Sequence, residues 1–199
     1  MDPEETATAY HEAGHLIVNY LLGWEVVEAT IVPGQYGDAR VRIADRFVRK
    51  QHEDQREWLR TGDSRNVDTW LPLVCLSGHA ALTLFEGGLD VSGTMDDAEA
   101  CFFYRHWLEC HEAEPVRLLV RCAQEILRVA CLLHIYWPAV EYFAEALCNH
   151  RTLRFGGGEP WQAELSRIVK ATAPVTDPAV QRALRPIPPL DVPPCPGET

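Results

Sequence analysis

The order of apolar and polar positions predicts a mostly helical chain with a short sheet near its start. Residues 3–22 repeat apolar side chains at helical spacing, with Asp2 placed as an N-cap and Gly23 as a C-terminal cap. Residues 24–32 and 39–43 are richer in β-branched side chains, and Pro and Gly residues separate them. We therefore expect one helix followed by two short strands joined by a turn.

The remainder of the chain has the pattern of successive helices. Residues 44–62 are charged and only weakly periodic, so a surface helix and a mobile loop fit them equally well. Further helices are expected over residues 66–85, 94–108, 112–135, 138–149 and 160–170. The expected fold class is α+β, mostly helical, with a small sheet followed by a helical bundle.

The composition changes abruptly at residue 171. Eight of the 14 prolines lie between Pro174 and Pro196. Such a density of proline is typical of extended or disordered chain. We therefore divide the sequence into a folded domain, residues 1–170, and a proline-rich, disordered tail, residues 171–199.

Charge and composition argue against several classes of function. The 29 Asp and Glu residues outnumber the 18 Lys and Arg residues, and the net charge of −11 would repel nucleic acid and anionic membranes. The acidic start does not resemble a secretory signal, and the most apolar stretch, Val129–Val140, is too short to span a bilayer. Seven Cys residues without a Cys-x-x-Cys pair indicate reduced thiols. These features predict a cytoplasmic protein with no membrane segment and no nucleic-acid partner.

One motif with metal chemistry lies in the first predicted helix, the His-Glu-x-x-His of His11–His15. Histidines four residues apart share one face of a helix, so both rings can reach a single Zn²⁺. Glu12, about 100° further round the helix, would lie beside the water that the metal activates. The alternative is a helix that buries two hydrogen-bonded histidines without a metal.

A catalytic zinc site also needs a third protein ligand from elsewhere in the chain. Acidic side chains lie at Asp96, Asp97 and Glu99, after the second predicted buried helix. Asp97 has another explanation, because an acid three residues after Thr94 is typical of the start of a helix. Spacing alone leaves both roles open.

Together these segments resemble the peptidase domain of FtsH-type ATP-dependent zinc proteases. Ala9–His15 is similar almost letter for letter to the zinc helix of that family, and Val26–Gly34 is similar to the strand that follows it. Leu76–Gly87 resembles the family's Gly-Gly-Arg-Ala-Ala-Glu-Glu helix, and Ser92–Asp97 resembles its Thr-Gly-Ala-Ser-Asn-Asp segment. The likeness covers about residues 4–170. It implies zinc ligands and a general base at these positions: His11, His15 and Asp97 as ligands, and Glu12 as the base.

The chain also departs from the family pattern. Ser77-Gly78-His79 and Leu82-Thr83 stand where the family has Gly-Gly-Arg and a pair of glutamates, so polar contacts behind the metal are expected to differ. The membrane anchor and the ATPase domain of the family are not found in this sequence. A separate ATPase chain is therefore a candidate partner.

Three functions are consistent with these observations. The first is a soluble zinc metalloendopeptidase that hydrolyses flexible or unfolded polypeptides. Its substrate would pair with the edge of the strand at 39–43. The hexamers of the resembled family imply a homo-oligomer. The second is a zincin-like binding or regulatory module, weak or inactive as an enzyme, that keeps a structural zinc. The third is a helical domain without metal. We take the first as the working hypothesis.

Overall fold

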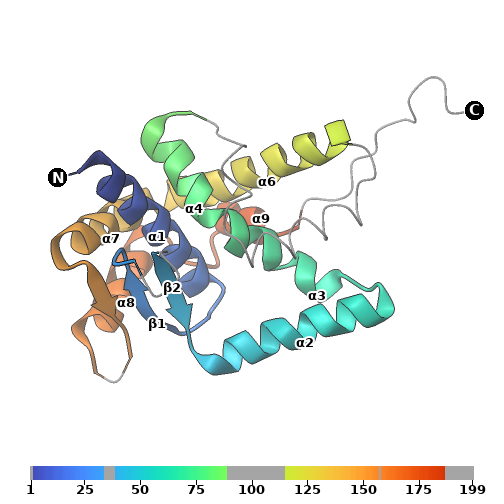
Figure 1. Ribbon diagram of the computed structural model, residues 1–199, viewed down its shortest axis with the longest axis horizontal. Helices are drawn as coiled ribbons and strands as arrows, with labels where there is room; N and C mark the ends of the chain where they lie inside the picture. Colours follow the sequence, from blue (N-terminus) through green and yellow to red (C-terminus); the bar gives the residue numbers. More distant parts are fainter. Residues whose placement is uncertain (1, 34–38, 89–114, 157, 187–199) are drawn as a thin grey trace, which may run out of the picture.

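The computed structural model describes residues 2–33, 39–88, 115–156 and 158–186 (Figure 1). These residues form a mostly helical α+β fold with a small antiparallel sheet, which confirms the predicted class. The helices are α1 (Pro3–Leu21), α2 (Asp45–Thr61), α3 (Arg65–Asp68), α4 (Leu71–Glu86), α6 (Pro115–Ile135), α7 (Trp137–His150), α8 (Pro160–Thr172) and α9 (Pro178–Leu184). The strands are β1 (Val26–Thr30), β2 (Arg40–Ile43) and β3 (Thr152–Arg154).

Helix α1 lies at the centre of the described structure. It begins at the N-cap Asp2, whose Oδ1 accepts a hydrogen bond from the backbone N–H of Glu4 at 3.1 Å, and Pro3 occupies its first turn. The face that carries Ala13 and Ile17 is fully buried. In Figure 1, α1 runs between α4 and α7, and it contacts both of these helices and the sheet. The predicted helix over residues 3–22 is therefore the main scaffold of the core.

The sheet has the strand order β2-β1-β3, and both pairings are antiparallel. Central strand residue Ala29 pairs with Val41 of β2 on one side and with Leu153 of β3 on the other. The hydroxyl oxygens of Thr30 and Thr152 lie 2.7 Å apart and join β1 to β3. The two predicted strands are confirmed, whereas β3 was not predicted as a strand.

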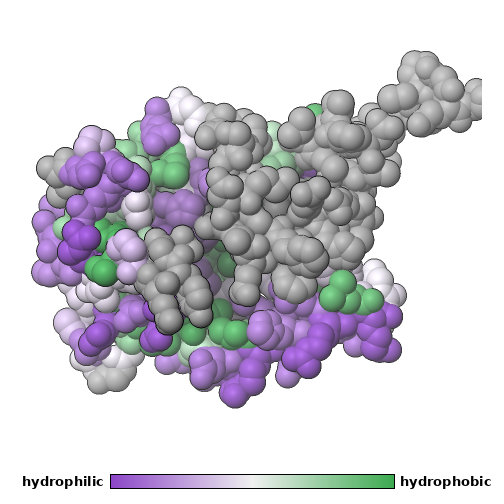
Figure 2. All heavy atoms as spheres, in the orientation of Figure 1, coloured by the Kyte–Doolittle hydropathy of each residue, from purple (hydrophilic) through white to green (hydrophobic). Residues whose placement is uncertain are grey.

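The ambiguous segment 44–62 is the helix α2. It ends at Gly62, whose φ of 75° lies in the left-handed region that glycine adopts readily. Trp58 is buried, and the indole N–H of Trp70 donates a hydrogen bond to the buried carboxylate of Asp54 at 3.3 Å. Most other side chains of α2 are polar, and Figure 2 shows hydrophilic residues along the edge of the molecule that α2 forms. Helix α2 therefore attaches to the fold through a few buried side chains, of which Trp58 is apolar and Asp54 and Gln55 are polar.

The helix predicted over residues 66–85 is divided into α3 and α4. By length and composition, the stretch Arg65–Glu86 would be sufficient to cross a membrane, which the sequence analysis did not anticipate. Most of its apolar window is buried inside the fold, where α4 contacts α1 and α6. Burial of this kind is typical of a core helix.

Helices α6, α7 and α8 confirm the predicted helices over 112–135, 138–149 and 160–170, with ends that differ by a few residues. The helix predicted over 94–108 lies outside the described residues.

The chain after residue 171 differs from the expected disordered tail in its described part. Asp177 caps α9 by accepting a hydrogen bond from the N–H of Ala179 at 2.7 Å. Helix α9 packs on α6, and its Val180 is fully buried. Its Pro178 occupies the first turn, where proline is compatible with a helix. The proline count alone therefore misled the prediction for this segment.

A buried ionic network on α6 reinforces the contact with α9. Glu125, which is only 1% exposed, pairs with Arg121 at 3.0 Å and with Arg128 at 2.6 Å. Arg128 also donates hydrogen bonds to the carbonyls of Ala183 and Arg185, at 3.0 and 2.7 Å. Buried charges are tolerated when they are paired and hydrogen-bonded. The C-terminal end of α9 thus supplies acceptors that the network uses.

We expect Val180→Ala to lower the free energy of unfolding by about 2 kcal/mol, because it removes two buried methyl groups and leaves a small cavity. Urea denaturation followed by circular dichroism measures the change. The control Arg182→Ala alters an exposed residue of the same helix and should stay within about 0.5 kcal/mol of the wild type. Equal stability of the two variants would show that α9 is not docked in solution.

Candidate metal centre

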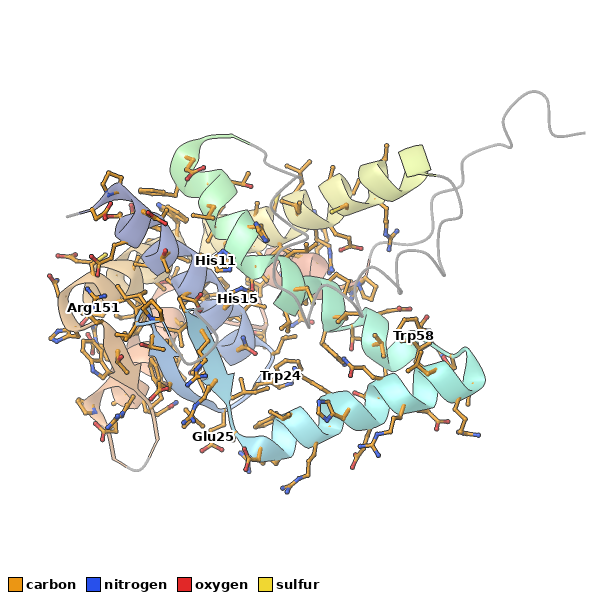
Figure 3. The ribbon with its side chains drawn as sticks, viewed as in Figure 1. His11, His15, Trp24, Glu25, Trp58 and Arg151 are labelled. Atoms are coloured by element: carbon orange, nitrogen blue, oxygen red, sulfur yellow. The ribbon has the colours of Figure 1, made fainter. Side chains whose placement is uncertain are left out.

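The two motif histidines lie together on α1. His11 Nε2 and His15 Nε2 are 3.0 Å apart, and the rings are 4.7 Å apart between centroids. Figure 3 shows both side chains on the side of α1 that faces α4. Two nitrogens bound to one tetrahedral Zn²⁺ at ~2.05 Å each would stand about 3.3 Å apart. The two imidazoles therefore converge with a separation close to that of a shared zinc ion.

Helix α4 contributes a polar contact to this pair. Ser77 is fully buried, and its Oγ lies 2.9 Å from His15 Nδ1. The same hydroxyl donates a hydrogen bond to the backbone carbonyl of Val74 at 3.1 Å. His15 therefore has one ring nitrogen directed at Ser77 and the other directed at His11.

The backbone of α4 forms a cradle for the His11 ring. A Cβ built on Gly78 would lie 2.3 Å from His11 Nε2, so any side chain at this position would overlap the imidazole. A Cβ on Gly14 would lie 2.4 Å from the carbonyl oxygen of Ser77. The two helices approach this closely because neither glycine carries a side chain. The ring of His11 is consequently held between α1 and the backbone of α4.

A third imidazole stands beside the pair. The ring of His79 on α4 lies edge-on to that of His11, with centroids 5.2 Å apart and an interplanar angle of 86°. Even so, among the residues that the structure describes, no group of three or more His, Cys, Asp or Glu side chains is arranged to hold a metal ion. The predicted third ligand, Asp97, lies outside the described residues, as do Asp96 and Glu99. The structure thus brings two of the three predicted ligands together.

Glu12 lies in the same turn of α1 and is buried, with only 4% of the residue exposed. It lies between the two histidines in sequence and about 100° from His11 round the helix axis. The neighbouring buried Asn19 donates a side-chain hydrogen bond to the backbone carbonyl of His15 at 2.7 Å. The turn that holds the histidines is therefore also rich in buried polar groups.

Aromatic residues anchor the helix just before the motif. Tyr10 stacks on Phe85 of α4 with ring centroids 4.0 Å apart, and on Trp137 of α7 at 5.6 Å. Burial, followed by the negative charge of Glu141, raises the pKa of Tyr10 above its ordinary value. This stack ties the start of α1 to both of its neighbouring helices.

The residues present fit a zinc ion. Zn²⁺ prefers imidazole nitrogens, and the His11 and His15 donors converge on one point. Zinc-binding histidines also usually engage a polar group through the other ring nitrogen, as His15 does with Ser77. Sequence reasoning noted Ser77 only as a departure from a family pattern; its contact with His15 depends on how α1 and α4 pack. The stacking of Tyr10 on Phe85 and Trp137 was not predicted either, although Tyr10 directly precedes the motif.

Comparison with known proteins adds no further assignment, because the chain matches no protein-family model and no curated protein.

We expect Gly78→Ala to weaken zinc binding by at least about tenfold while the fold survives. The new Cβ displaces the movable ring of His11, and a zinc site tolerates only about 0.2 Å of error in ligand distance. Competition with a chromophoric chelator measures the affinity, and circular dichroism reports the fold.

Two matched glycine variants give this experiment its controls. Gly14→Ala meets backbone atoms of α4 and should instead destabilise the fold, by roughly 1–3 kcal/mol. Gly88→Ala has open space round its Cβ and should change neither quantity. Unchanged zinc affinity in Gly78→Ala would contradict the placement of His11.

Proposed function

We propose that the protein is a zinc metalloendopeptidase that hydrolyses peptide bonds of flexible or unfolded polypeptides. The observation that carries this proposal is the convergence of His11 Nε2 and His15 Nε2, 3.0 Å apart, within a His-Glu-x-x-His helix. The resemblance to the FtsH-type peptidase domain supplies Asp97 as the third ligand and gives the fold a zincin-like interpretation.

The proposed chemistry divides between the ion and the chain. His11, His15 and Asp97 would hold Zn²⁺, which when bound polarises the scissile carbonyl and lowers the pKa of water from 15.7 toward ~7. Glu12 accepts the proton of the attacking water and delivers it to the nitrogen of the leaving amine. Its place in the same helical turn as both histidines supports this role.

Strand β2 is the proposed docking edge for the substrate. In the described sheet, β2 is an outer strand that pairs with β1 on one side. An extended peptide can add to such an edge through backbone hydrogen bonds, which tolerate many sequences. Flexible chains meet this requirement directly, whereas folded substrates would need a separate ATPase chain to unfold them. From the charge, the acidic start and the thiols we also propose a cytoplasmic protein, and from the resemblance alone a homo-oligomer.

A second candidate function is a binding or regulatory module that keeps a structural zinc. It is favoured by Leu82 and Thr83 on α4, which stand where the FtsH-type family has two glutamates. Both residues are partly buried, so the change replaces charged groups with groups that suit the core. The ligands are retained in this reading, whereas turnover is lost.

Metal analysis combined with a peptidase assay tests these proposals. The purified protein is examined for bound zinc, then incubated with casein and with quenched fluorescent peptides, with and without a chelator. Zinc together with chelator-sensitive cleavage supports the peptidase. Zinc without cleavage supports the module, and a protein that binds no zinc contradicts both.

We expect Glu12→Gln to retain zinc and lose peptidase activity by at least about 100-fold, because it removes the proton acceptor and leaves the ligands in place. The matched control is Glu4→Gln, which removes the same charge from an exposed position of α1. Turnover of quenched peptides is measured for both variants. Full activity in Glu12→Gln would refute the assigned base.

Asp97→Asn tests the third ligand. If Asp97 binds zinc, loss of its anionic oxygen should weaken zinc affinity by at least 10 to 100-fold. That range is typical for mutation of residues that hydrogen-bond to a metal ligand. If Asp97 only starts a helix, affinity should be unchanged and stability should fall by no more than ~1 kcal/mol. Asp96→Asn is the neighbouring control. We expect the first pattern for Asp97 and no effect for Asp96.

A further inference from the structure

The Ser77 hydroxyl lies between a backbone carbonyl of its own helix and a ring nitrogen of α1. Its Oγ is 3.1 Å from the carbonyl oxygen of Val74 and 2.9 Å from His15 Nδ1. A backbone carbonyl can only accept, and a serine hydroxyl has a single hydrogen to donate. Once that hydrogen is directed at Val74, the oxygen presents lone pairs to the His15 ring.

This arrangement favours one position for the hydrogen of a neutral His15 ring. Two lone pairs facing each other at 2.9 Å would repel, so a neutral His15 has to carry its hydrogen on Nδ1 and donate it to Ser77. The other nitrogen, Nε2, then carries a lone pair and lies 3.0 Å from His11 Nε2. We propose that Ser77 is a positioning residue that holds His15 in the Nδ1–H tautomer and so presents Nε2 as a metal ligand.

The surroundings of Ser77 make this selection effective. Ser77 is fully buried in the contact between α1 and α4, where water does not compete for its hydroxyl. A hydrogen bond is electrostatically stronger in such a medium than in water. Free histidine, in contrast, prefers to carry its hydrogen on Nε2, which would block the metal-binding lone pair.

The geometry also fixes the state of His11 in the metal-free protein. With His15 Nε2 acting as acceptor, the 3.0 Å contact between the two rings requires His11 to donate from its own Nε2. The two histidines should therefore carry opposite tautomers, and His11 serves as an internal reference. The tautomer of His15 can be tested without zinc; only its effect on affinity rests on the proposed function.

Long-range ¹H–¹⁵N spectra of the zinc-free, full-length protein labelled at histidine test the inference. The spectra are recorded at about pH 9, well above the pKa of free histidine. We expect His15 as Nδ1–H and His11 as Nε2–H in the wild type. In Ser77→Ala we expect His15 to shift mainly to Nε2–H, and zinc affinity to fall by 10 to 100-fold.

Two further variants separate positioning from packing. Ser77→Thr retains the hydroxyl and should keep the Nδ1–H signature of His15. Cys75→Ala removes one heavy atom from a buried position of α4 that lies about 200° round the helix from Ser77, and it should leave the tautomer unchanged.

A wild-type His15 with its hydrogen on Nε2 would overturn the inference, whether or not any variant folds. An unchanged tautomer in folded Ser77→Ala would overturn it as well. If the tautomers are as expected but the wild type binds no zinc, the proposed function fails and the assignment of Ser77 to His15 stands.

Discussion

The close approach of α1 and α4 is the contact on which both the core and the candidate metal centre depend. At Gly14 and Gly78 a single additional carbon would overlap the opposite helix or the ring held against it. Each glycine lowers helix stability by up to about 1 kcal/mol relative to alanine. Here the absence of a side chain allows backbone and imidazole to meet directly. The histidine face of α1 can therefore pack against α4 because α4 has no side chain at Gly78.

The same contact gathers buried polar groups into one region of an apolar core. Glu12 and Asn19 belong to α1, and Ser77 belongs to α4; all three are buried within about a turn of a histidine or in contact with one. Burial of a polar group in such a medium costs free energy unless the group is hydrogen-bonded. A hydrogen bond made there is strong and orients the group. Most other buried side chains of these two helices are apolar. The concentration of polarity at one turn is what a rigid ligand site needs.

The sequence predicted the features that depend on local order. The cap at Asp2, the helical period of α1 and the shared face of His11 and His15 all follow from neighbours within a few residues. Strand β3 and helix α9 have three and seven residues, too few for a period to be recognised, and contacts distant in sequence stabilise them. The contact of Ser77 with His15 could not be predicted either, because it depends on how α4 packs against α1. Asp97 remains a prediction.

The pairing of β1 with β3 has a consequence for how the chain acquires its structure. Ala29 and Leu153 are separated by more than a hundred residues, and α1 finds its helical partners in α4 and α7, which lie far along the sequence. During synthesis the segment that carries His11 and His15 is made first, yet the surfaces that enclose it are made much later. Contacts of such long sequence separation slow folding and leave apolar faces exposed in the interim. The two histidines can thus form as a helical motif early, but they become a site only when α4 has been made and has packed against them.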